Sequence, residues 1–593
     1  METTADETRE STESQAPPRA TEPGSELQLE QLSVADGLYL LIAFAATMMR
    51  FSGLGQIPLS PTEAKEALAA WQFLQAGQHI VEFNSPAYFT LTSLLMSFFG
   101  TNDLTARIVA VIFGLGLVLL PWLLRERLGR IGALVTATLF AVSPLLATVS
   151  RTAGGESIAL FAILLATIAT LRLLNDRKQQ WLYVLAIALG LGLASSSLIY
   201  SGLVTFTIAW WLQRKIHPES GPIIWPERAE LFKAIIIGVV VFISLSTRFL
   251  THLSGVGAAA QLFGDWLALF SLQGDLQALL TPFLVLARYE IVLLPLGVIG
   301  ILWSIWRNHP LGTLFTYWLL MCLILILLQR GVVDNALLVL LPGYLLLGLT
   351  TNHLLRRGLT HSTWAVTGIL ILLSAIVLVN VARFLRVSLT EQQILNLWIA
   401  LMALSGAVMA IYYFWSVHEE AVLQGIWLAV LLLLLLFQWG TAWNLTHNTA
   451  NDPRERWVEQ ATDDDIPVLI STLQDISRKA TNSNADLALY SAVDSPVLRW
   501  YLRDFWRAQF GQTIPPGAQF EAIISRSDAT EPALGSDYLG SDFGLLRAGM
   551  LPSSGSSTPV LDAMRWWLFH ETLNGVMEDR IILWVRTDLA YPQ

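Results

Sequence analysis

The chain has 593 residues, of which 54% are hydrophobic and only 14% are charged, and its mean hydropathy is +0.54. A soluble chain of this length would need a larger charged surface, so the composition predicts a polytopic membrane protein. The formal net charge is -10, and the chain carries no basic stripe that would indicate a nucleic-acid partner. The single cysteine, Cys322, excludes a disulfide framework.

The first 34 residues are polar and rich in Pro, Ser, Thr and Glu, without hydrophobic periodicity. This composition predicts a disordered tail, which we expect on the cytoplasmic side. The tail lacks the positive and then apolar pattern of a cleaved signal peptide, so the first span is expected to remain as an anchor.

Residues 35–445 contain apolar stretches near 20 residues long, which is the length that crosses roughly 30 Å of hydrocarbon. We predict about thirteen transmembrane helices in an all-α membrane domain, with long external loops at 53–102 and 250–286. The predicted spans centre near residues 43, 114, 139, 165, 188, 205, 240, 296, 320, 343, 373, 403 and 431. They show no internal repeat, which disfavours an inverted-repeat transporter.

Arginine and lysine in the short loops set the expected orientation. With a cytoplasmic N-terminus, the inner loops hold clusters such as Arg125, Arg127 and Arg130, whereas most basic residues on the other side stand singly. This bias predicts a multi-pass protein of the cytoplasmic membrane whose C-terminal region is extracytoplasmic.

Residues 452–593 change character and predict a small α/β domain. We expect strands at 485–492, 520–527, 542–549 and 580–589, and helices at 466–480, 495–510 and 561–573. At about 140 residues, the region is large enough for its own core.

A charged helix is predicted directly after the first span, in the stretch "SPTEAKEALAAWQFLQAG". Ser60 has the position of an N-cap, Pro61 is the first helical residue and Glu63 stands where a capping box needs it. The same helix carries Lys65 and Glu66. Glu63 therefore either caps its own helix or serves a reaction.

The segments that follow contain an ordered set of short motifs. These are Pro86 and Tyr88; Gly100, Asp103, Ala106 and Arg107; Arg127, Leu128 and Gly129; and Ser143, Pro144, Ser150, Arg151, Ala153 and Glu156. With Thr62 and Glu63 they resemble the N-terminal half of the GT-C glycosyltransferase superfamily, in particular its protein O-mannosyltransferase and aminoarabinose-transferase branch. The similarity spans roughly residues 35–350, and the C-terminal region looks like that of a bacterial subgroup with an external domain.

This resemblance implies a membrane enzyme that moves a sugar from a polyprenyl-phosphate donor to a hydroxyl of a protein, lipid or glycan acceptor. An inverting transfer needs a carboxylate to take the acceptor proton, and cationic groups to hold the departing phosphate. The resemblance assigns Glu63 as the base and Glu156 as a second carboxylate that orients the acceptor or a divalent cation. Arg151 is the first candidate for the phosphate, followed by Lys65 and Arg248.

One position departs from the pattern. Such enzymes carry an Asp-Glu pair whose aspartate is catalytic, whereas this chain has Thr62 in the place of the aspartate. Either Glu63 has taken over, or the chain is a degenerate scaffold that binds cell-envelope partners. A lipid or solute transporter is a third alternative, although most charges stand at span ends.

The remaining polar residues carry weaker signals. Arg107 is expected to pair with Asp103, one helical turn earlier. Asp334 and Asn335 either bind a sugar or cap a loop, Asp265 and Asp275 either line the acceptor path or mark helix starts, and His252 either binds substrate or lies on the surface; caps and surface positions are the simpler interpretation. The sequence has neither zinc-ligand spacing nor a Gly-rich phosphate loop.

Overall fold

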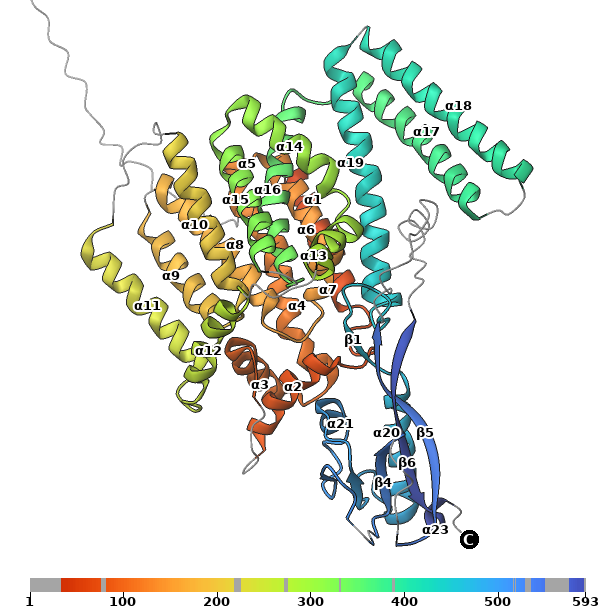
Figure 1. Cartoon of the computed structure of the whole chain (residues 1–593). Helices are drawn as coiled ribbons and strands as arrows, with labels where there is room; N and C mark the ends of the chain where they lie inside the picture. The colour runs from red at the N-terminus through yellow and green to blue at the C-terminus, as the bar shows by residue number, and fades with distance from the viewer. Residues whose placement is uncertain are drawn as a thin grey trace, which may run out of the picture.

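The computed structural model describes residues 33–590 except 76–81, 177, 218–225, 271–275, 330–331, 387–389, 417, 516, 518, 528–534 and 550–574. Asp275 and the predicted helix at 561–573 therefore lie outside the described residues. The predicted N-terminal tail also lies outside them, except for its last two residues. Figure 1 shows two parts: a large helical bundle and, below it, a domain that contains the strands.

The bundle is built from α1 to α19. These helices are α1 (Val34–Phe51), α2 (Pro61–Leu74), α3 (Pro86–Phe99), α4 (Asp103–Leu119), α5 (Arg125–Leu128), α6 (Arg130–Val142), α7 (Pro144–Val149), α8 (Glu156–Asp176), α9 (Gln179–Leu193), α10 (Leu198–Ile216), α11 (Arg228–Ser246), α12 (Gly255–Ala268), α13 (Leu276–Tyr289), α14 (Leu293–Arg307), α15 (Pro310–Leu328), α16 (Asn335–Leu355), α17 (His361–Arg386), α18 (Thr390–Trp415) and α19 (Glu419–Trp443). All thirteen predicted span centres lie inside these helices.

Length and composition refine the predicted number of spans. Within the described residues, nine helices are long and apolar enough to cross a membrane. A tenth span is formed if α13 and α14, which are bent by 96° at their junction, count as one. The apolar helices α3, α6 and α9 are shorter. The all-α membrane class is thus confirmed, with fewer full-length spans than the predicted thirteen.

Short polar signals fix where the helices begin. Ser33, Ser60 and Asn102 each form a capping box at the start of α1, α2 and α4. These caps satisfy backbone N–H groups that have no partner inside the helix. In contrast, α17 and α18 carry exposed apolar side chains along their length, including Leu372, Met402 and Met409. A surface of this kind suits contact with lipid.

Two buried ionisable side chains hold the break between α6 and α7. Arg50 donates to the carbonyls of Phe140 (3.0 Å) and Ala141 (3.2 Å), where α6 ends. Glu290 accepts from the Ser143 hydroxyl (2.5 Å) and from the Leu145 N–H (3.1 Å), where α7 begins. Because helix ends leave backbone groups without partners, both contacts stabilise this break inside the bundle.

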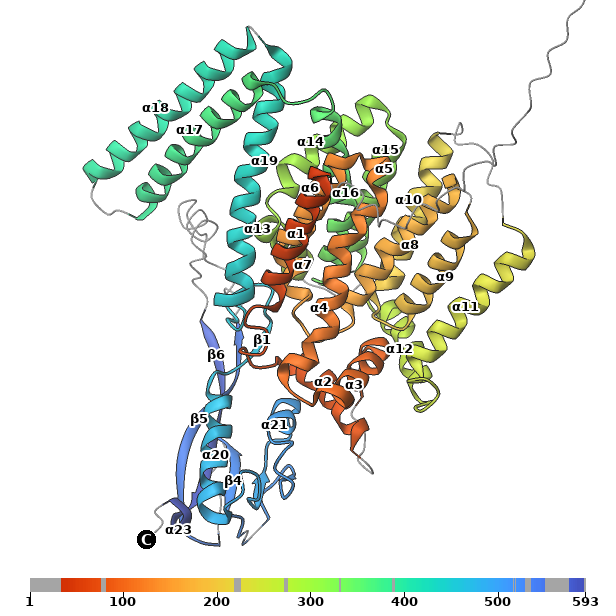
Figure 2. The ribbon, with the colours of Figure 1, turned by 180° about the vertical axis from the view of Figure 1, so that it is seen from behind.

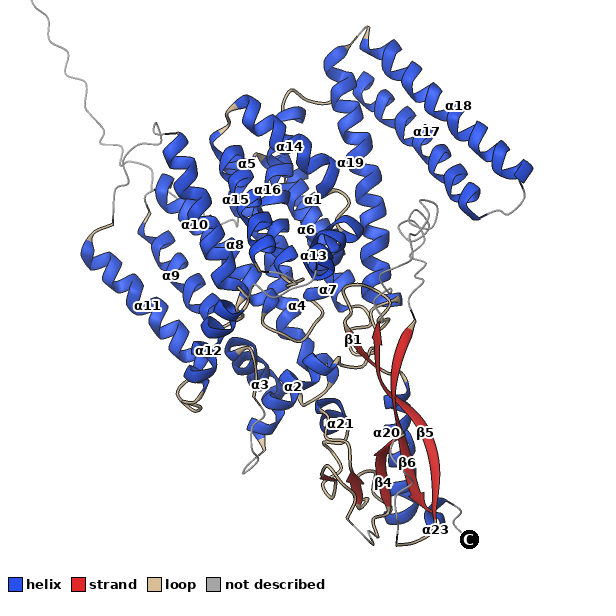
Figure 3. Cartoon of the chain, in the orientation of Figure 1, coloured by secondary structure: helices blue, strands red, loops and turns tan. Residues whose placement is uncertain are grey.

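The C-terminal domain contains one mixed sheet of six strands in the order β1-β5-β6-β4-β2-β3 (Figure 3). The strands are β1 (Gln460–Thr462), β2 (Leu489–Ser491), β3 (Gln509–Phe510), β4 (Ala522–Arg526), β5 (Tyr538–Gly549) and β6 (Val576–Arg586), and the helices are α20 (Asp465–Thr481), α21 (Pro496–Tyr501) and α23 (Thr587–Ala590). All four predicted strands are present, together with β1 and β3.

One predicted helix of this domain is wrong in length. The pattern predicted a helix over 495–510, but α21 ends at Tyr501 and the last two residues of that range form β3. Gln509 and Phe510 pair in parallel with Tyr490 and Ser491 of β2. The backbone hydrogen bonds of the sheet therefore override the helical periodicity of the side chains.

Candidate functional site

The predicted site residues lie at the end of the bundle that meets the C-terminal domain. Figure 2 shows α2 and α3 at this end, beside the start of α4 and close to α21. The loops before α2 and before α8 reach the same region, because Glu63 of α2 accepts a hydrogen bond from the Ala153 N–H.

Glu63 is buried and uses both carboxylate oxygens in four hydrogen bonds. Oε1 accepts from Arg107 Nε (2.8 Å) and from the Ala153 N–H (2.8 Å). Oε2 accepts from Arg107 NH2 (2.8 Å) and from the Ser60 N–H (2.9 Å). Desolvation opposes ionisation, but Arg107 and the backbone donors outweigh it and hold the pKa of Glu63 below its ordinary value.

The expected pair between Arg107 and Asp103 is wrong. Arg107 turns instead toward Glu63 and also donates to the carbonyls of Leu54 (2.9 Å) and Ile57 (2.8 Å). Asp103 accepts from Trp500 Nε1 (2.8 Å) and the Tyr501 hydroxyl (2.6 Å) of α21. Arg107 therefore pairs with Glu63, which is distant in sequence but buried beside it, and not with the partially exposed Asp103 one helical turn away.

Arg151 binds the end of a helix. Its NH1 donates to the carbonyls of Met49 (3.0 Å), Arg50 (3.1 Å) and Ser52 (2.7 Å), where α1 ends. Burial and the nearby Arg107 charge lower the pKa of Arg151 to about 10. The predicted role of Arg151 in phosphate binding stays a prediction, but this geometry gives it a structural task.

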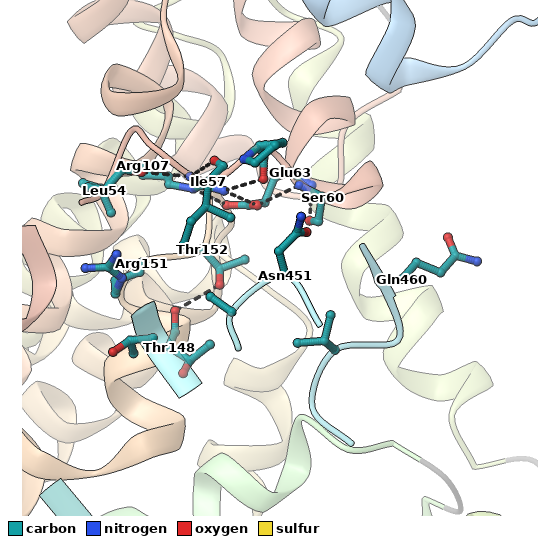
Figure 4. Close-up of a pocket in the computed structure, with 14 residues that line it drawn as sticks. Leu54, Ile57, Ser60, Glu63, Arg107, Thr148, Arg151, Thr152, Asn451 and Gln460 are labelled. Atoms are coloured by element: carbon teal, nitrogen blue, oxygen red, sulfur yellow. Dashed lines mark hydrogen bonds and ion pairs between the residues drawn. The ribbon is translucent and has the colours of Figure 1, made fainter. Parts of the chain in front are cut away.

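Glu63, Arg107 and Arg151 line one small cavity, which Asn451 and Gln460 border from the C-terminal side (Figure 4). Its volume is about 70 Å³, which accommodates water but not a sugar phosphate. Glu63 and Arg151, two of the side chains to which the resemblance assigns roles in the reaction, therefore line the same cavity, whereas Glu156 does not line it.

Glu156 is the first residue of α8 and follows the tight loop Ala153-Gly154-Gly155. The loop passes directly against the segment that caps α3. A Cβ on Gly155 would lie 2.1 Å from the Ser195 carbonyl oxygen and 2.4 Å from Ser85 Oγ. Glycine is therefore required for this close approach, which brings the start of α8 beside the loop that precedes α3.

Glu66 lies one turn beyond Thr62 on α2 and differs sharply from Glu63. Its Oε1 accepts from the Asn84 N–H (2.6 Å), while its buried Oε2 has no hydrogen-bond partner among the described residues. Desolvation, together with the negative charge of Glu156, raises the pKa of Glu66 to about 7. The Glu156 charge also contributes, after desolvation, to a raised pKa of Asp334. Glu66, Glu156 and Asp334 therefore form an electrostatically coupled set of carboxylates.

Arg248 approaches this region from the turn after α11. Its Nε donates to Ser93 Oγ (2.8 Å), and its guanidinium carbon lies 4.3 Å from the ring centroid of Phe73. Desolvation lowers the pKa of Arg248. Residues 248–250 all have left-handed backbone conformations, which cost energy for residues other than glycine. Such a turn is commonly retained where it presents a side chain for function.

Two further predictions concern Lys65 and metal binding. Lys65 is half-buried on α2, and its positive charge acts on Glu66. Among the described residues no group of three or more His, Cys, Asp or Glu side chains could hold a metal ion. Sequence reasoning left Glu66 without a role, although its spacing of four residues from Thr62 placed it on the same face of the helix.

Comparison with known proteins bears on the fold. Residues 84–216 match the family model for dolichyl-phosphate-mannose-protein mannosyltransferase. The crystal structure of ArnT from Cupriavidus metallidurans bound to undecaprenyl phosphate is similar with a TM-score of 0.55 and 14% identity, covering 94% of this chain and 100% of that one. The chain has the GT-C glycosyltransferase fold.

Other GT-C structures are similar at lower scores. ArnT from the same organism in the apo state gives a TM-score of 0.49 at 16% identity, covering 79% of this chain and 85% of that one. The Archaeoglobus fulgidus oligosaccharyltransferase gives 0.41 at 12% identity, covering 81% and 62%. No curated protein matches the chain by sequence.

Proposed function

We propose that the protein is a membrane glycosyltransferase that moves a sugar from a polyprenyl-phosphate donor to an acceptor hydroxyl at the outer face of the cytoplasmic membrane. The observation that carries this proposal is the similarity of nearly the whole chain to an ArnT structure that contains undecaprenyl phosphate. The match of residues 84–216 to a family of lipid-phosphate-sugar transferases supports the same reaction class.

The chemistry assigns distinct tasks to the charged side chains. The acceptor hydroxyl loses its proton as it attacks the anomeric carbon, and the bond between that carbon and the lipid phosphate breaks. Glu156 orients the acceptor from the start of α8. Cations near the departing phosphate stabilise the charge that it gains.

Arg248 is better placed than Arg151 to bind this phosphate, and Lys65 of α2 is a second candidate. Arg248 uses only Nε in a hydrogen bond among the described residues, so its two terminal NH2 groups can form a fork around phosphate oxygens. Arg151 already donates from NH1 to three carbonyls. The phosphate would then lie beside Phe73 and Ser93, close to α2 and α3.

The test is transfer by purified protein in proteoliposomes. Undecaprenyl phosphate carrying radiolabelled mannose, glucose or aminoarabinose is supplied with envelope extract as the acceptor, and the released undecaprenyl phosphate is measured by mass spectrometry. We expect release with at least one donor, a strong reduction in Arg248→Ala and none in Arg307→Ala, a control at the end of α14. Donor binding without release from any donor would favour the scaffold, and labelled sugar crossing the bilayer without acceptor would favour transport.

A further inference from the structure

We infer that Glu66 is the catalytic base of this transferase and occupies the place in the reaction that Thr62 cannot fill. The inference rests on the proposed function and names the residue that receives the acceptor proton. Three neighbouring positions of α2 carry the argument: Thr62, Glu63 and Glu66.

Thr62 and Glu63 are both unsuited to the task. The Thr62 hydroxyl is exposed and lies 3.1 Å from Ser60 Oγ, and a hydroxyl group cannot accept a proton at neutral pH. Glu63 already accepts four hydrogen bonds, two of them from Arg107, so neither oxygen has room for an acceptor hydroxyl. Its pKa is also held low, which further weakens it as a base.

Glu66 has the properties that the other two lack. The residue is only 5% exposed, so its carboxylate is desolvated. The Asn84 N–H holds one oxygen in place, and the other oxygen is buried without a hydrogen-bond partner in the part of the chain that the structure describes. A buried polar atom without a partner costs free energy and is rare in folded proteins. A substrate hydroxyl donating to Oε2 would satisfy it.

The groups around Glu66 give its carboxylate a pKa that suits a catalytic base. On α2 itself Lys65 favours the ionised form, and from the start of α8 Glu156 opposes it. Desolvation has the largest effect, and together with these smaller contributions it brings the pKa of Glu66 to about 7, where a carboxylate is ionised in a large fraction of molecules yet basic enough to take a proton. The Asn84 and Ser85 N–H groups, from the loop before α3, favour the ionised form and keep the pKa from rising further.

The resulting step is balanced. The acceptor O–H bond breaks and its proton passes to Glu66 Oε2, while the acceptor oxygen bonds to the anomeric carbon of the sugar. The bond from that carbon to the lipid phosphate breaks, and its electron pair leaves with the polyprenyl phosphate. The proton on Glu66 is then released to water.

The decisive variants are Glu66→Gln and Glu66→Asp, measured by transfer kinetics in proteoliposomes. Glu66→Gln keeps the shape and the contact with Asn84, so we expect kcat to fall by about 10²- to 10⁴-fold, with an unchanged KM for the donor. Glu66→Asp keeps the negative charge but has a shorter side chain, which moves the carboxylate away from the substrate, so we expect kcat to fall about tenfold or more. The control is Glu126→Gln, an exposed carboxylate on α5.

A double variant tests whether the role of the base has moved from position 62 to position 66 of α2. Thr62→Asp added to Glu66→Gln returns a carboxylate to the position used by the enzymes that this chain resembles. We expect at least a tenfold gain in kcat over Glu66→Gln alone, and no gain would count against the exchange of positions.

Wild-type protein supplies a measurement that does not depend on any variant folding. The rate at low donor concentration should rise with pH through a value near 7, because only ionised Glu66 accepts the proton. A rate that is flat from pH 5 to 8, or a Glu66→Gln enzyme within threefold of wild type, overturns the inference. A wild-type enzyme that releases no undecaprenyl phosphate from any donor instead overturns the proposed function.

Discussion

The pair of Glu63 and Arg107 gives a sharp quantitative prediction about stability. Their side chains are each only 6% exposed, and NH2 of Arg107 lies 2.8 Å from Oε2 of Glu63. All four partners of the carboxylate are N–H donors. In Glu63→Gln the amide nitrogen would face two of these donors, and the Arg107 charge would be buried without compensation.

Breaking a buried pair in this way costs about 3–5 kcal/mol of unfolding free energy. The control is Glu126→Gln, because Glu126 pairs with Arg172 but is 64% exposed, so we expect a loss of only about 0–1 kcal/mol. Unfolding by SDS in dodecyl maltoside micelles, followed by tryptophan fluorescence, measures both. If Glu63→Gln keeps its stability within about 1 kcal/mol and loses transfer, then Glu63 is the base and our assignment of a structural role is refuted.

Three further outcomes are expected. Gly155→Ala should reduce the transfer of radiolabelled sugar strongly, because the added Cβ would overlap backbone and side-chain atoms of neighbouring loops. The control is Gly264→Ala, which should leave transfer unchanged because no atom lies within 4 Å of the added Cβ. Tyr501→Phe removes the hydroxyl that donates to Asp103, so a loss of about 1.5–3 kcal/mol should appear as faster proteolysis of the C-terminal domain. Because burial and Glu156 raise the folded-state pKa of Glu66, wild type should lose stability relative to Glu66→Gln as pH rises from 4.5 to about 7; a constant difference in SDS unfolding across these pH values would contradict this.

The sequence predicted the helices well because each depends on local information. A run of apolar residues must form a helix in lipid, where every backbone group needs an internal partner, and all thirteen predicted centres lie in helices. The capping box of Ser60 and Glu63 was equally local and is confirmed. Spans shorter than the hydrocarbon thickness, such as α6, were not distinguished, because breaks such as Ser143-Pro144 depend on contacts with other helices.

The site was harder to predict because its decisive contacts join distant residues. Arg107 could be given a partner only from its own helix, whereas its actual partner is 44 residues away. Arg151 had the charge expected of a phosphate ligand, and no local pattern indicated that it would bind the end of α1. For the same reason, the free oxygen of Glu66 could not be distinguished from the occupied oxygens of Glu63.

The contacts around α2 are consistent with the inferred division of roles, in which Glu63 is structural and Glu66, one turn later, is the base. Arg107 holds the carbonyls of Leu54 and Ile57, and from the C-terminal domain the Tyr501 hydroxyl accepts from the Leu59 N–H (2.8 Å). The entry to α2 is thus fixed from two sides, and Glu63 completes this anchoring. A base must hold its geometry without using the oxygen that reacts. Because the anchoring is done at Glu63, Glu66 can keep one oxygen for substrate.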